Sequence, residues 1–116
     1  MAMDSKVTHE VAKKLFDKIA DEWALTESEK RSLLNTELMD KLNIPMSDLY
    51  KISALIGIYE SLQVLLGGEQ ARRSWIRKPN SEWDGASALD IMSTGNFEDI
   101  EKVNRYLKSW REQSNF

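Results

Sequence analysis

The chain contains 116 residues, of which 41% are hydrophobic and 30% charged, and its formal net charge is −3. This composition is typical of one soluble globular domain, and no apolar run reaches the ~20 residues that a membrane helix needs. A weakly acidic chain is also a poor candidate for coating nucleic acid through bulk charge.

The sequence has no cysteine and a single histidine, His9. Disulfides are therefore excluded, and a zinc site or a Cys/His or Ser/His nucleophile would have to form around that one side chain. We expect neither a metal nor a cofactor. The first six residues lack the apolar core of a secretory signal, so the expected location is the cytoplasm.

The first predicted element is a helix near the amino terminus with Thr8 as its cap. Val11, Leu15, Ile19 and Trp23 follow at steps of four residues, so they share one helix face. We expect that face to be buried against the rest of the protein.

Two short helices are predicted next. Thr26 and Glu29 have the spacing of a capping box, which starts a helix that reaches about Leu34. Thr36 is the predicted cap of a third helix, which ends by Asn43 because the proline at position 45 disfavours helical backbone just before it. The pair has the outline of a DNA-binding helix-turn-helix.

The charges of the third helix argue against DNA reading. It carries Glu37 and Asp40 against only Lys41, and each uncompensated carboxylate near phosphate weakens binding. The alternative is that these helices simply pack in an orthogonal bundle.

The longest predicted helix runs from Ser47 to Leu66 and stops at Gly67 and Gly68. Its apolar stripe widens until little of the later half is polar, which is typical of a helix buried on several sides. It is therefore expected to be either the central helix of one chain or a seam between two chains.

Two further helices are predicted before the last one. One spans Glu69 to Arg77 and ends at the proline that follows. The other is a short turn of helix capped by Ser87, with Asp90 as the partner for the free backbone donors, and it stops at Gly95.

The last predicted helix starts near Asn96 and frays beyond Trp110. Its apolar residues lie at steps of three and four and share a face: Phe97, Ile100, Val103, Leu107 and Trp110. Strand-like alternation is absent from the sequence, so the predicted fold is an all-α, compact multi-helix domain.

A basic cluster is the first candidate for function, and it consists of Arg72, Arg73, Arg77 and Lys78. Such a cluster suits a carboxylate, a phosphate or an acidic protein surface, whereas a solvated helix face is the simpler interpretation. Aromatic residues form the second candidate, as interface anchors or as core: Trp75, Trp83, Tyr106 and Trp110.

Carboxylates form the third candidate, a possible acid and base of a small hydrolytic enzyme: Asp84, Asp90, Glu98 and Asp99. Helix starts explain three of the four, because acidic residues are favoured at the positive end of a helix. The sequence therefore gives little support to an enzyme, and we expect none.

The second half of the chain carries a longer motif series. It comprises residues 52–62, Ala71, residues 75–80, Gly85, residues 87–92, Gly95 and residues 103–107. In order and spacing the series resembles the toxin-binding domain of the Xre/MbcA/ParS-like antitoxins, over about residues 50 to 112.

The resemblance implies an antitoxin of a type II toxin–antitoxin system that neutralises a RES-domain toxin, an enzyme that depletes cellular NAD, by blocking its active site. It implies a division into an Xre-like, degenerate helix-turn-helix region at residues 1–46 and a toxin-binding domain at residues 47–116. It further implies a homodimer within a hetero-oligomeric complex, with promoter DNA as an additional partner in autoregulation.

Partner contact is then expected from exposed basic and aromatic residues of the second half and from the carboxy-terminal tail. The expected residues are Arg73, Arg77, Lys78, Trp83, Arg105, Tyr106, Trp110, Arg111 and Phe116. The alternative function is a DNA-binding transcriptional regulator whose carboxy-terminal half mainly dimerises. Promoter binding with a steep salt dependence would favour that alternative.

Overall fold

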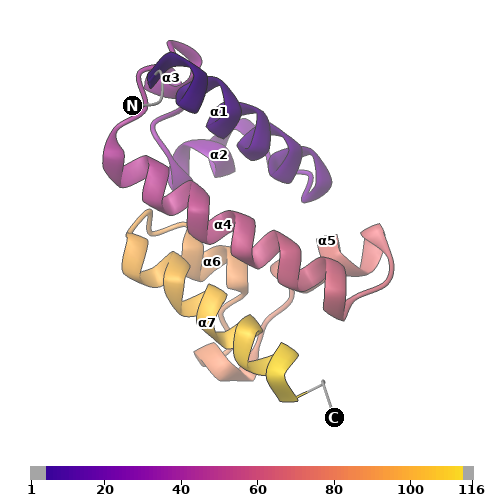
Figure 1. The fold of residues 1–116 in the computed structure, drawn as a ribbon. Helices are drawn as coiled ribbons and strands as arrows, with labels where there is room; N and C mark the ends of the chain where they lie inside the picture. The colour runs from indigo at the N-terminus through magenta and orange to yellow at the C-terminus, as the bar shows by residue number, and fades with distance from the viewer. Residues whose placement is uncertain (1–4, 114–116) are drawn as a thin grey trace.

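The computed structural model describes residues 5–113, and the side chains of residues 5–7 fall outside that description. Seven α-helices and one short 3-10 helix, η1, account for the regular structure of this part of the chain (Figure 1). They are α1 (Ser5–Glu22), α2 (Glu27–Leu33), α3 (Thr36–Asp40), α4 (Met46–Leu65), α5 (Glu69–Arg77), η1 (Ser81–Trp83), α6 (Ala88–Met92) and α7 (Phe97–Gln113). The expected all-α fold is confirmed.

Helix α4 runs through the middle of the molecule. It packs against α1 on one side and α7 on the other, while α6 packs between α5 and α7 (Figure 1). Leu55, Ile58 and Leu62 of α4 are fully buried, so this helix contributes to both halves of the core. The predicted central helix is thereby confirmed, and none of the helices in residues 5–113 is long and apolar enough to cross a membrane.

The buried face of α1 differs from the predicted one. Val11 and Leu15 are 50% and 39% exposed, and Phe16 is fully buried in their place, whereas Ile19 and Trp23 are buried as predicted. Two apolar stripes overlap on this helix, and the stripe with Phe16 buries the larger apolar area, so it faces the core. Thr8 lies inside the helix and is not its cap.

Helix starts are mostly where the sequence predicts them. The Thr26 capping box is present, with Glu29 N–H donating to Thr26 Oγ1 at 3.1 Å and Thr26 N–H donating to Glu29 Oε1 at 2.8 Å. The predicted cap at Thr36 is wrong, because the Asn35 side chain caps α3 and accepts from Leu38 N–H at 3.0 Å. Asparagine is the stronger cap of the two.

Two other boundaries shift. Helix α4 begins at Met46, after Pro45, and not at Ser47, since a proline at a helix start sacrifices no hydrogen bond. Helix α7 continues past Trp110 to Gln113, where fraying was expected. Phe97, predicted on the buried face of α7, is 36% exposed and packs edge-on against the ring of Tyr50, with centroids 6.4 Å apart.

Candidate partner-binding surface

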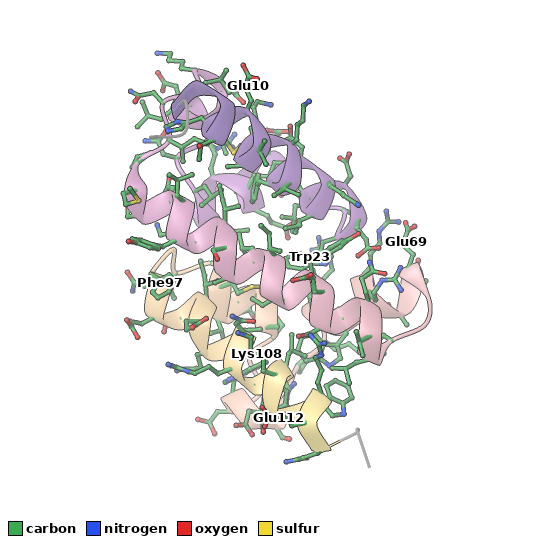
Figure 2. All side chains as sticks on the ribbon, in the orientation of Figure 1. Glu10, Trp23, Glu69, Phe97, Lys108 and Glu112 are labelled. Atoms are coloured by element: carbon green, nitrogen blue, oxygen red, sulfur yellow. The ribbon has the colours of Figure 1, made fainter. Side chains whose placement is uncertain are left out.

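The arginines of α5 point back into the molecule and grip the end of α1. Arg72 forms an ion pair with Glu22 at 2.9 Å and donates to the carbonyl of Leu66 at 2.9 Å. Arg73 donates through Nε to the carbonyl of Glu22 at 2.6 Å and pairs with Glu69 at 2.7 Å. Figure 2 shows Glu69 on the first turn of α5, near the end of α1.

Arg77 completes this arginine clamp, which we define as Arg72, Arg73 and Arg77. Its guanidinium binds both carboxylate oxygens of Glu29, at 2.8 and 3.0 Å, in the fork geometry that makes such pairs strong. It also donates to the carbonyls of Trp23 and Ala24 at 3.1 and 3.0 Å.

The clamp explains how α1 ends. The last carbonyls of a helix have no partner within the helix, and basic side chains near that end can satisfy them. Arg73 and Arg77 supply donors to four carbonyls at or just after the end of α1, those of residues 21–24. Two of the expected partner-binding residues are therefore engaged inside the chain.

The pairing with Arg77 changes the acidity of its partner. The hydrogen bonds from Arg77 hold the pKa of the Glu29 carboxyl below its usual value, and the Thr26 backbone N–H adds to this effect, while partial burial opposes it. Glu29 thus closes the cap of α2 and anchors α5 at the same time.

The aromatic residues gather into one cluster, contributed by α5, η1 and α7. Ring centroids lie 5.2 Å apart for Trp83 and Tyr106, and Trp75 lies 6.3 to 6.5 Å from each of the other three rings, including Trp110. All four side chains are half-buried. A hollow of about 290 Å³ opens beside Tyr106 and Trp110.

The turn between α5 and α6 holds Trp83 in this cluster. The Asn80 side chain caps η1 by accepting from Glu82 N–H at 2.9 Å, and the Asn80 carbonyl accepts from Gly85 N–H at 3.0 Å. Gly85 has a φ of 91°, in the region that favours glycine. The predicted Ser87–Asp90 capping box follows, with both of its hydrogen bonds at 3.0 Å.

The remaining expected residues are dispersed. Lys78 and Arg105 are exposed, and no side chain in residues 8–113 pairs with their charges. Arg111 turns towards α4 and donates to Ser61 Oγ at 3.4 Å. Phe116 lies outside the described residues. The structure therefore brings Trp83, Tyr106 and Trp110 together, with Trp75 as their shared neighbour.

Comparison with known proteins places this geometry in a family. The family model described as the antitoxin Xre/MbcA/ParS C-terminal toxin-binding domain matches residues 61–112. An uncharacterized protein of Sinorhizobium fredii (strain NBRC 101917 / NGR234), y4oB, is 33% identical over 104 residues, which cover 83% of this chain and 81% of that protein. This chain belongs to the Xre/MbcA/ParS antitoxin family.

The match assigns an antitoxin role of the toxin-binding kind to the second half of the chain. It begins inside α4 and includes the whole aromatic cluster and the whole arginine clamp. The antitoxin family resemblance expected from the motif series is confirmed, whereas no solved structure matches the chain.

Proposed function

We propose that this antitoxin neutralises a RES-domain toxin, an enzyme that depletes NAD, by docking the aromatic cluster on it and blocking its active site. The observation that carries the proposal is the open cluster of Trp83, Tyr106 and Trp110 inside the toxin-binding domain. Half-buried tryptophan and tyrosine are the commonest anchors of protein interfaces, since they bury much apolar area from a rigid position. The NAD chemistry in this proposal belongs to the toxin.

Two exposed cations flank the cluster in sequence and extend the proposed surface. Lys78 follows α5 directly, and Arg105 precedes Tyr106 on α7. Cations at the rim of an interface mainly speed association and select partners with an acidic surface. In this proposal Arg73 and Arg77 act from within, by holding α5 on α1, and Arg111 faces α4.

The tail beyond α7 is the proposed plug. Helix α7 carries Trp110 in its last turns and leads into residues 114–116, which end in Phe116. Removing these three residues is expected to loosen inhibition of the toxin and leave the helical content unchanged. Full inhibition by the shortened chain would refute the plug and leave the aromatic docking surface standing.

Promoter binding is treated separately, because it would depend on α3. Helix α3, the expected reading helix, presents exposed Glu37 and Asp40 side chains, 78% and 68% accessible, which would face phosphate. We propose that this helix supports the fold and that any autoregulation depends on the assembled complex. Specific promoter binding by the antitoxin alone, with a steep salt dependence, would favour the transcriptional regulator instead.

The central experiment is co-expression with the product of the adjacent gene, if that product is RES-like. Expected results are a stable complex, restored growth and restored cellular NAD. A Trp83→Ala variant should lose rescue, while Lys102→Ala, an exposed change on α7, should keep it. A stable complex that leaves NAD depletion unchanged would contradict the proposed block of the active site.

A further inference from the structure

The single histidine of the chain joins the start of α1 to the segment between α3 and α4. Ile44 N–H donates to His9 Nδ1 at 2.8 Å, across 35 positions of sequence. His9 is half-buried, and Ile44 is only 4% exposed. Figure 1 shows α3 beside the first turns of α1, and the two helices are in contact.

The imidazole satisfies a backbone donor that the segment before α4 does not satisfy itself. Lys41, Leu42 and Asn43 donate their backbone N–H groups to carbonyls of α3, at 2.9 to 3.2 Å. Pro45 has no N–H to donate. Ile44 N–H donates instead to His9, which lies on another helix. Because a buried backbone N–H without a partner is rare and costly, this side chain contributes directly to the placement of the segment.

This hydrogen bond fixes the protonation state of the imidazole. Nδ1 can accept only while it carries no proton, so the ring is neutral and its hydrogen lies on Nε2. In the imidazolium both ring nitrogens are donors, and a hydrogen on Nδ1 would point at Ile44 N–H. Protonation of His9 therefore breaks the hydrogen bond and leaves a buried donor unpaired.

The charged groups around His9 do not favour the imidazolium. Lys13 lies one helix turn further along the same face of α1, and it pairs with Asp17 at 2.9 Å and with Asp40 of α3 at 3.8 Å. A protonated His9 would place a second cation near Lys13. Glu10 lies on another face of α1, because adjacent positions of a helix do not face each other. The other charged groups of α3, the following segment and the start of α4 form their own ion pairs: Glu37 with Lys41, and Asp48 with Lys51.

We propose that this hydrogen bond, the His9 latch, is a proton-sensitive switch that holds α3 and the start of α4 on α1 at neutral pH and releases them in acid. Histidine is the side chain that ordinarily changes charge between pH 5 and 8. The folded chain needs a neutral ring at His9 and the unfolded chain does not, so the unfolded state binds the additional proton. Stability therefore rises with pH through this range and is lost on acidification.

The arginine clamp carries the effect of the latch into the second half of the chain. Helix α1 holds the latch near its start, and the acceptors of Arg73 and Arg77 lie at its end, at residues 21–24. Acid that loosens α1 therefore also weakens the contacts that hold α5. If the antitoxin neutralises a toxin as proposed above, acidification favours free toxin, but the latch itself does not depend on that function.

Denaturant unfolding at pH 7.0 and pH 5.5 tests the proposal with two variants. The folding equilibrium constant of the wild type should fall about three- to tenfold between these values, as expected for one proton taken up on unfolding. His9→Asn places an acceptor oxygen where Nδ1 lies and does not titrate, so its constant should change less than about twofold. His9→Phe keeps a ring without an acceptor, so it should be less stable than the wild type at pH 7.0 and show no pH step.

Nuclear magnetic resonance of the ¹⁵N-labelled chain tests the geometry, because the chain contains only one imidazole. At pH 7.5 Nε2 should carry the hydrogen and Nδ1 should not. A hydrogen on Nδ1, an equal pH step in the wild type and His9→Asn, or a His9→Phe variant as stable as the wild type at pH 7.0 would each overturn the proposal. These measurements include no toxin, so failure of toxin neutralisation is a separate result.

Discussion

The arginine clamp and the aromatic cluster both include residues of α5. They differ in whether their side chains interact within the chain or remain open to solvent. In the clamp, Arg72, Arg73 and Arg77 donate hydrogen bonds to carboxylates and carbonyls of the same chain. In the cluster, the rings pack on one another and stay partly exposed to solvent. The three arginines of the clamp therefore stabilise the fold, whereas the aromatic cluster leaves apolar area available to a partner.

The strongest test of this contrast is Trp110→Ala. We expect toxin affinity to fall by about 30-fold to 1,000-fold, which is 2 to 4 kcal/mol for a buried interface anchor. Trp110→Phe should retain most of the affinity, because the ring contact with Trp75 survives. Titration calorimetry with the toxin measures both, and unchanged affinity in the alanine variant would move docking away from the cluster.

Arg77→Ala should lower the stability of the fold and leave toxin affinity unchanged. Losing the fork to Glu29 and the two helix-end carbonyls should lower the free energy of unfolding by about 1.5 to 3 kcal/mol, while toxin affinity of the folded protein holds. Lys78→Ala is the control and should stay within about 0.5 kcal/mol. Denaturant unfolding gives the stabilities; a stable Arg77→Ala variant that binds toxin poorly would place Arg77 at the interface.

Gly85→Ala tests the turn that holds Trp83. Alanine at a φ of 91° is strained, so we expect a loss of about 1 kcal/mol or slightly more in stability. Because this turn positions Trp83, the tryptophan fluorescence of the chain should shift as well. The neighbouring Ser81→Ala change serves as the comparison, and an equal stability loss there would show that the φ at Gly85 is unimportant.

Acid titration of stability should give the smallest effect. Because the pKa of Glu29 is depressed in the folded protein, its contribution is complete above the ordinary pKa of a glutamate and is lost as pH falls through the lower folded value. Arg77→Ala should remove that part of the acid dependence. Melting temperatures of both proteins across this pH range check it, and parallel curves would mean that the pair contributes nothing.

Local rules predicted much of the secondary structure. The capping boxes at Thr26 and Ser87 and the span of α5 were readable, because each depends on residues only a few positions apart. The first half of the buried face of α1 was not, since two overlapping apolar stripes compete there and only packing against α4 selects between them. Short-range chemistry was thus easier to predict than the choice of a buried face.

The site was predicted less completely. The four aromatic residues were predicted as candidates, and the structure brings them into one cluster, while their role in toxin binding stays a prediction. The acceptors of Arg73 and Arg77 include backbone carbonyls some fifty positions away, which no side-chain pattern reveals. The burial of Asn104 was not predicted either, because it depends on the close approach of Gly57 on another helix.

The clamp also has a consequence for how the molecule unfolds. The three arginines belong to the toxin-binding half, but their acceptors at residues 21–24 and Glu29 belong to the other half. Melting α1 would remove several acceptors of these guanidinium groups and expose the fully buried Trp23, so neither half can open alone at low cost. A protease that cleaves the amino-terminal helices should therefore destabilise the toxin-binding half without cutting the proposed docking surface.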